Sequence, residues 1–213
     1  MKIGLKIIKS VVRFLNRSRL RNNNFSLVSN TCLGGMISHE LGLQFKSPTI
    51  NCAFFVPAEF NVFVSNIDYY VNQPIDFIPS EYKYPVGVLR SELGDVTIHF
   101  IHYSTEAEVR KKWYDRAKRL DLDNLFVLVD GDNCPEEDVE EFDRLNLKHK
   151  AIITMKDYPG LKSVFVIKNP KYCQGDLLKT KLCGDALHWF ELFDYVHFFN
   201  TGKIRSSRIF RNK

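Results

Sequence analysis

Apolar and polar positions follow two periods along the chain, the two-residue period of strands and the wider spacing of helices. The clearest strand is at 96–103, where the two kinds of side chain alternate strictly and place His99 and His102 on opposite faces. A continuous apolar run at 125–129 predicts a strand that is buried on both faces. The same reasoning predicts shorter strands at 25–29, 86–89, 151–155 and 163–167.

Helices are predicted between these strands. Thr105 and Glu108 form a capping-box pattern, which opens a helix that ends near Leu120. Pro135 and the three acids after it suit the first turn of another helix. Further helices are expected at 36–41, 57–70 and 184–199. Strands that alternate with helices predict an α/β fold, with a mostly parallel or mixed sheet flanked by helices in Rossmann-like layers.

The first twenty residues have the pattern of a basic amphipathic helix, with an apolar arc opposite an arc of bases. The bases are Lys2, Lys6, Lys9, Arg13 and Arg17. This layout predicts either a helix in the interface of an anionic membrane, bound through residues 1–20, or an ordinary helix docked on the domain. Frequent charges exclude a membrane span, and the unbroken apolar core of a signal peptide is missing. We therefore divide the chain into this helix, 1–22, and a single α/β domain, 23–213.

The composition is that of an ordinary soluble protein, with 45% hydrophobic and 26% charged residues, but the charge is unevenly distributed. The net charge is +5, yet residues 1–39 and 195–213 together hold twelve bases and no acid, which leaves −7 between them. Both ends suit an anionic surface, whereas an acidic body without a basic groove argues against nucleic acid as a partner. Five scattered cysteines without a secretion signal indicate reduced thiols in a cytoplasmic protein. Together with the basic ends, they fit a peripheral position on the inner face of the membrane.

A polar loop with a cysteine and two glycines follows the first predicted strand. It reads Ser29-Asn30-Thr31-Cys32-Leu33-Gly34-Gly35. A helix that begins here would turn backbone N–H groups and its positive end toward the loop, which favours a bound phosphate or oxyanion. The candidate ligand-binding residues of the loop are therefore Ser29, Asn30, Gly34 and Gly35. The glycines allow close approach to a pyrophosphate or, as the alternative, only shape a tight turn.

Cys32 is the candidate nucleophile of this loop, because a helix N-terminus favours the thiolate. His99 is the candidate catalytic partner, and His102 is a further candidate ligand-binding residue. Strand alternation places His102 among apolar neighbours, so we expect it to be the more buried of the two histidines. The alternative for Cys32 is a small buried residue that packs the turn.

Asp130 and Asp132 follow the buried strand at 125–129. Carboxylates at such a position can hold a divalent cation against a sugar-nucleotide diphosphate, so these two residues are the candidate metal ligands. The alternative is a plain turn that leads into a helix, which Pro135 just downstream favours. A divalent cation is the one cofactor that the sequence suggests.

Several motifs resemble those of an uncharacterised bacterial family whose members are commonly described as exopolysaccharide biosynthesis proteins, encoded near capsule or lipopolysaccharide genes. The shared motifs are the segments 25–35, 40–43, 46–49, 84–87 and 95–103, with Trp113 and the acidic run at 136–138. The resemblance covers about residues 20–200, although at 129–132 the acids are similarly spaced but the residues differ. It implies an α/β fold and a role in cell-envelope glycan assembly, and it implies no particular reaction.

Three functions follow as candidates for a protein of bacterial polysaccharide assembly. The first is sugar transfer from a nucleotide sugar, with the diphosphate held at 32–35 and a cation at Asp130 or Asp132. The second is a Cys32–His99 acyltransferase or hydrolase that acts on a glycan. The third is a non-catalytic module that binds a glycan or a partner enzyme at the membrane.

Overall fold

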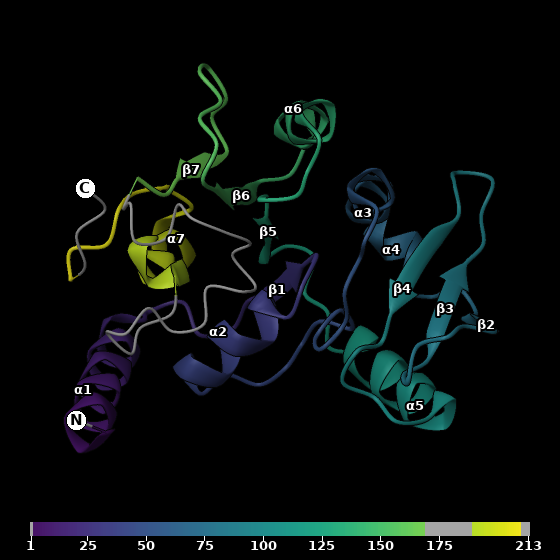
Figure 1. The fold of residues 1–213 in the computed structure, drawn as a ribbon, viewed down its shortest axis with the longest axis horizontal. Coiled ribbons are helices and arrows are strands. Elements are labelled where there is room, and N and C mark those ends of the chain that lie inside the picture. The colour runs from purple at the N-terminus through teal and green to yellow at the C-terminus, as the bar shows by residue number, and fades with distance from the viewer. Residues whose placement is uncertain (1, 169–188, 210–213) are drawn as a thin grey trace.

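The computed structural model describes residues 2–168 and 189–209, and it contains two β-sheets (Figure 1). The first sheet is wholly parallel, in the order β1-β5-β6-β7. Its strands are β1 (Ser26–Ser29), β5 (Leu125–Asp130), β6 (His149–Thr154) and β7 (Val164–Val166). The second sheet is antiparallel and consists of β2 (Asp76–Ile78), β3 (Val86–Leu89) and β4 (Val96–His99). The predicted α/β fold with a mixed arrangement of strands is thus confirmed.

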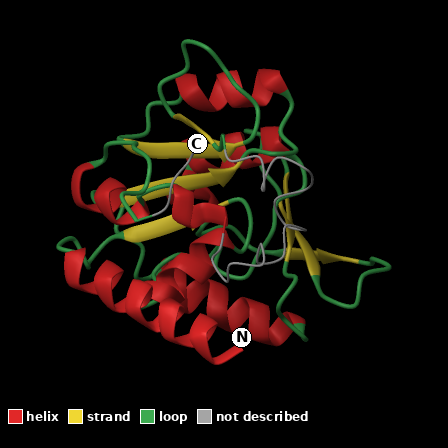
Figure 2. Cartoon of the chain, turned by 60° about the vertical axis from the view of Figure 1, so that its left-hand side comes forward, coloured by secondary structure: helices red, strands yellow, loops and turns green. Residues whose placement is uncertain are grey.

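Helices cover both faces of the parallel sheet (Figure 2). On one face lie α2 (Leu33–Leu41), the 3-10 turn η1 (Trp189–Leu192) and α7 (Tyr195–Thr201), with α1 (Lys2–Arg19) packed on α2. On the other face lie α3 (Pro57–Ser65) and α6 (Glu136–Arg144), while the short α4 (Ile67–Tyr70) and α5 (Glu106–Ala117) lie beside the antiparallel sheet (Figure 1). None of the helices in these described ranges is long and apolar enough to cross a membrane.

Alternate side chains of β1 and β5 pack into two separate cores. Leu27 and Leu128 point into the core with α2 and α7. Val28 and Val127 point into the opposite core, which also holds the antiparallel sheet and the ring of Trp113 on α5. A parallel strand that is covered on both faces needs apolar residues in sequence rather than alternation, which explains the continuous apolar run in β5.

Residues 53 and 54 join the two sheets. Ala53 exchanges two backbone hydrogen bonds with His99 at the end of β4, with N···O distances of 2.8 and 2.9 Å. The next N–H, that of Phe54, donates to the carbonyl oxygen of Asn30 beyond the end of β1, at 2.9 Å. The antiparallel sheet is therefore fixed against the carboxyl end of the parallel sheet.

The structure corrects the prediction for 96–103. The strand ends at His99, because residues 100–103 turn back, with the Tyr103 N–H donating to the Phe100 carbonyl oxygen at 3.0 Å. Both of these aromatic side chains enter the core, and Thr105 then caps α5 as predicted. As a result the burial of the two histidines is the reverse of the expectation: His99 is buried and His102 is exposed.

Other boundaries differ in smaller ways. The helix expected at 57–70 is broken at Asn66, whose backbone leaves the helical region, so that α3 and α4 form. Strand β2 lies in a segment for which no strand was predicted, because two of its three residues are exposed and it has no apolar alternation. Of the helix expected at 184–199, residues 184–188 lie outside the described residues, and the rest forms η1 and α7.

Candidate functional site

The carboxyl ends of β1 and β5 are joined by one side chain. The Asn30 amide donates from Nδ2 to the carbonyl oxygen of Asp130 at 3.0 Å, and its Oδ1 accepts the Asp130 N–H at 2.9 Å. A side chain thus continues the strand pairing for one more residue after β1 itself has ended at Ser29. Asn30 is buried, and the two hydrogen bonds hold Asp130 in a fixed position at the edge of the sheet.

A pocket of about 410 Å³ opens at these strand ends; we call it the strand-end pocket. Its polar wall comes from the last residue of β5 and the loops after β1 and β5, and it comprises Asn30, Thr31, Cys32, Asp130 and Asn133. Its apolar wall comes mainly from the segment before and at the start of α3 and from the turn after β4, and it comprises Ala53, Phe54, Phe55, Pro57 and Ile101. The buried Cys134 of the loop after β5 completes the lining. The volume is in the range of small-molecule sites, and ligands of open α/β sheets bind outside the carboxyl ends of the strands.

The two aspartates predicted as metal ligands have different positions. Asp130 lines the pocket, is mostly buried, and accepts the N–H of Asp132 at its Oδ1, at 3.4 Å. Asp132 does not line the pocket, and its Oδ1 accepts the backbone N–H of Met155 beyond β6, at 3.1 Å. Within residues 2–168 and 189–209, no three His, Cys, Asp or Glu side chains gather closely enough to hold a metal ion. A cation at Asp130 would therefore take most of its ligands from a bound substrate and from water.

Cys32 lines the pocket as the N-cap residue of α2, but its chemistry is not the predicted one. Burial raises the pKa of the Cys32 thiol to about 11, whereas a position at a helix N-terminus was expected to lower it. Burial also raises the pKa of Cys134 to about 12, and the negative charge of Asp130 acts in the same direction. The raised pKa values favour the protonated form of both thiols at neutral pH.

Iodoacetamide should consequently modify Cys32 slowly at neutral pH. We expect a rate at pH 7.5 about a hundredfold below that of free glutathione in the same tube, because only a minute fraction of the thiol is ionised. The rate should climb steadily as the pH is raised toward 10. Mass spectrometry of the peptide that contains Cys32 measures it. Modification as fast as that of glutathione at pH 7.5 would contradict the raised pKa and restore the nucleophile hypothesis.

The structure does not bring His99 into the strand-end pocket. Its ring stacks on Phe55, with centroids 3.9 Å apart, and the rings of Tyr82 and Tyr84 flank it at 5.1 and 6.1 Å. Burial lowers the pKa of His99, and its Nδ1 has no hydrogen-bond partner among the described residues. His99 therefore supports one aromatic residue of the pocket wall, and it is not placed as a base for Cys32. His102 is exposed and does not line the pocket either.

The loop glycines have a packing role. A Cβ added to Gly34 would lie 3.2 Å from the Cβ of Ser29, and one added to Gly35 would lie 3.1 Å from Oδ1 of Asn51. Glycine thus allows α2 to approach β1 and the segment that follows α2. Ser29 is buried, and its Oγ accepts the N–H of Thr31 at 3.4 Å. Ser29 and the two glycines do not line the pocket.

Of the predicted site residues, the structure brings Asn30, Cys32 and Asp130 together in one pocket. The apolar wall and Asn133 were not predicted from the sequence. The one local signal for that wall was the apolar segment at 45–56, which ends at Pro57 and is too irregular to be an ordinary strand.

Comparison with known proteins gives two matches. A protein-family model described as "Domain of unknown function (DUF1919)" matches residues 3–200. An "Uncharacterized protein" from Haemophilus influenzae is 39% identical over 204 residues, which cover 91% of this chain and 96% of that protein. The matches extend across both sheets and the strand-end pocket.

Proposed function

The chain belongs to the DUF1919 family, and from this premise we propose that its strand-end pocket binds the sugar part of a nucleotide sugar or glycan in a transferase-like enzyme. The proposed setting is the assembly of bacterial envelope polysaccharide at the cytoplasmic face of the membrane. This setting follows the resemblance of the segments 25–35 and 95–103 to exopolysaccharide biosynthesis proteins.

One observation carries the proposal: a carboxylate whose backbone is fixed by Asn30, together with side-chain amides, faces an apolar, aromatic wall across a single pocket. A sugar has hydroxyl groups that donate to carboxylate and amide oxygens, and it has C–H faces that pack on apolar surface. Asp130 and Asn133 offer the first kind of contact, and Phe54 and Phe55 offer the second. The Phe55 ring stacks on the His99 ring, and this stacking fixes its orientation before a ligand binds.

The same geometry supports a role for Asp130 in transfer. As an acceptor hydroxyl oxygen bonds to the anomeric carbon of the donor, its proton passes to the Asp130 carboxylate, and the bond to the diphosphate breaks with its electron pair on the leaving oxygen. A divalent cation would offset the charge of a diphosphate next to Asp130. The Cys32–His99 alternative loses support, because the thiol is protonated and His99 lies outside the pocket.

Thermal unfolding with a panel of nucleotide sugars and Mn²⁺ tests the proposal. A donor at about a hundred times its Kd should add about 3 kcal/mol of stability, or about 5–10 °C in melting temperature. Asp130→Asn should lose this shift, while the exposed control Asp157→Asn should keep it. A lack of response to every donor would refute the nucleotide-sugar site. A response to free glycans alone, without turnover, would favour the non-catalytic module.

A further inference from the structure

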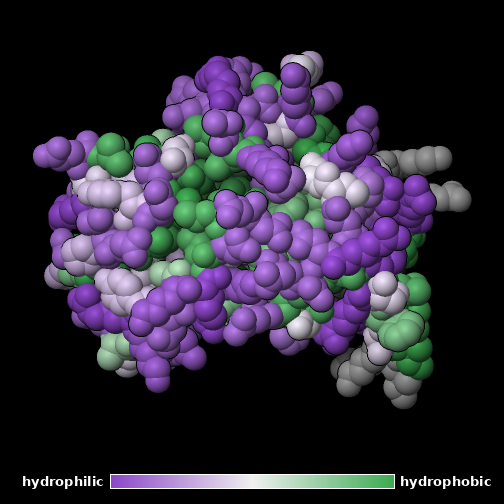
Figure 3. All heavy atoms as spheres, turned by 180° about the vertical axis from the view of Figure 1, so that it is seen from behind, coloured by the Kyte–Doolittle hydropathy of each residue, from purple (hydrophilic) through white to green (hydrophobic). Residues whose placement is uncertain are grey.

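Helix α1 carries an apolar strip that faces away from the protein. We define the apolar strip as Ile7, Val11, Phe14 and Leu15, whose exposed fractions are 58%, 50%, 71% and 41%. Their spacing of four, three and one residues keeps them on one face of the helix. The hydrophobic side of α1 is visible at the lower right of Figure 3. Large apolar side chains that gather on one exposed face mark an interaction surface.

The orientation of α1 is fixed by contacts on its other side. Val12 and Asn16 are buried, and Nδ2 of Asn16 donates to the Tyr195 hydroxyl at 2.7 Å. Arg13 forms two hydrogen bonds with the carboxylate of Glu40 on α2, each 2.7 Å long. The helix therefore rests on the domain through Val12 and these polar contacts, and turning the apolar strip inward would break all of them. These contacts also occupy Arg13, one of the bases that the sequence assigned to lipid headgroups.

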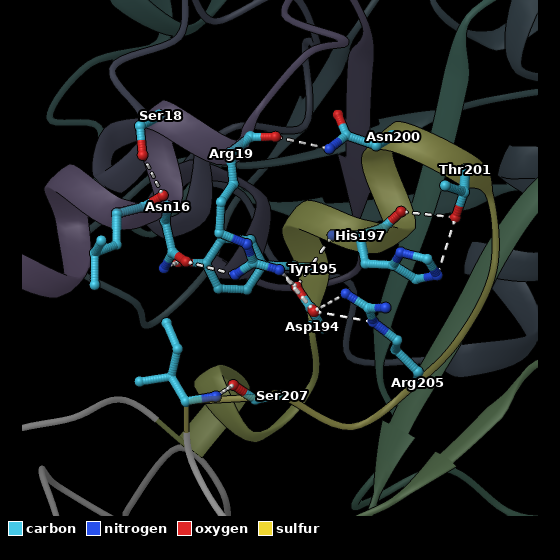
Figure 4. A network of polar contacts seen from close by, with 12 residues as sticks. Asn16, Ser18, Arg19, Asp194, Tyr195, His197, Asn200, Thr201, Arg205 and Ser207 are labelled. Carbon is cyan, nitrogen blue, oxygen red and sulfur yellow. Dashed lines mark hydrogen bonds and ion pairs between the residues drawn. The ribbon is translucent and has the colours of Figure 1, made fainter.

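The two acid-free ends of the chain meet at this helix (Figure 4). Arg19 of α1 and Arg205 near the C-terminal end both bond to the carboxylate of Asp194, each at 2.7 Å. Asn200 of α7 donates to the Arg19 carbonyl oxygen and accepts the N–H of Arg21. Exposed bases of both ends belong to the segments that are joined here, and they are Arg21, Lys203 and Arg208. The Arg17 guanidinium instead donates to the carbonyl oxygens of Glu40 and His39 at the end of α2.

We propose that this face docks on an anionic lipid membrane. The apolar strip enters the boundary between headgroups and acyl chains, and the exposed bases of the two ends contact the headgroups. The positive charge of this face favours an anionic membrane over a second copy of the chain as its partner. A symmetric dimer through this face would bring together two surfaces that are both rich in bases. The acidic body, with its net charge of −7 over residues 40–194, would turn away from the same lipid surface. This docking does not depend on what the strand-end pocket binds.

Flotation of the full-length protein with phosphatidylcholine vesicles, with and without phosphatidylglycerol, tests the docking. The wild type should float with the anionic vesicles, and added salt should weaken its binding. Val11→Ser/Phe14→Ser should bind at least about tenfold more weakly, because it removes apolar surface that the bilayer would bury. Leu93→Ser is the control: it removes an apolar side chain about as exposed as Val11, in the loop between β3 and β4, and should bind as the wild type does.

Both substituted positions are exposed, so the double variant should keep the melting temperature of the wild type. Wild-type protein that stays with neither vesicle at low salt would overturn the proposal, as would a double variant that floats normally. The proposal would also be overturned if light scattering showed a dimer for the wild type and a monomer for the double variant. A second copy of the chain would then cover the apolar strip. Arg21→Gln/Lys203→Gln should reduce binding to the anionic vesicles only.

Discussion

Replacing Asp194 by alanine is expected to lower the free energy of unfolding by about 3–5 kcal/mol. The carboxylate is buried, and it binds Arg19 and Arg205 through its two oxygens. Its Oδ1 also accepts the N–H of His197, which caps the first turn of α7. Alanine would leave two guanidinium groups without their shared anion and remove the cap, so α1, α7 and the C-terminal segment would all lose an anchor.

Urea unfolding followed by circular dichroism measures this loss. Asp95→Ala is the matched control, because Asp95 also pairs with an arginine, Arg90, but both side chains of that pair are about half exposed. An exposed ion pair contributes about 0–1 kcal/mol, so the control should be nearly as stable as the wild type. Equal losses in the two variants would show that the Asp194 cluster is no stronger than an ordinary surface pair.

The pH dependence of stability provides a second measurement of the same cluster. Burial alone would raise the pKa of Asp194, but hydrogen bonds from Arg205 and Arg19 outweigh it and hold the pKa below its usual value. A lowered pKa in the folded state contributes stability that is complete above the pKa of the unfolded chain and disappears as the pH falls through the folded value. The difference between wild type and Asp194→Ala should therefore be constant from pH 7 to about 5 and shrink below about pH 4.

Local signals in the sequence were sufficient for the elements that local interactions define. The capping box predicted the start of α5, and in the structure the Thr105 hydroxyl does accept the Glu108 N–H, at 3.2 Å. The buried run in β5 was recognised because a strand that is covered on both faces has no polar positions. The end of β4 at His99 was missed, because the turn that follows depends on burying Phe100 and Tyr103 against distant helices.

The candidate site was predictable only on its polar wall. Asn30, Cys32 and Asp130 follow strands in the sequence, and parallel strands bring their carboxyl ends to one edge. The apolar wall depends on the hydrogen bonds of residues 53 and 54, which connect partners about twenty and fifty residues away in sequence. The raised pKa of Cys32 depends on the same long-range packing, so the position of the thiol was predictable while its protonation state was not.

Because Asn30 both joins the two strands and lines the pocket, its substitution tests the fold and the site together. Asn30→Ala should lower the free energy of unfolding by about 2–4 kcal/mol, since it removes two buried hydrogen bonds to the Asp130 backbone and puts no polar group in their place. Asn30→Asp should lose a similar amount, because a carboxylate oxygen would replace Nδ2 and face the Asp130 carbonyl oxygen. Urea unfolding measures both losses.

The effect on ligand binding separates the two roles of Asn30. Without the hydrogen bonds of Asn30, Asp130 is no longer held at the sheet edge. Asn30→Ala should therefore not bind the nucleotide sugar even at temperatures where it remains folded, and the donor should not raise its melting temperature. Asn133→Ala removes an exposed amide of the same pocket, and its stability should stay within about 0.5 kcal/mol of the wild type. An Asn30→Ala protein that is destabilised but retains the full ligand shift would mean that Asp130 needs no support from β1. Wild-type stability in Asn30→Ala would mean that the strand ends are held by backbone pairing alone.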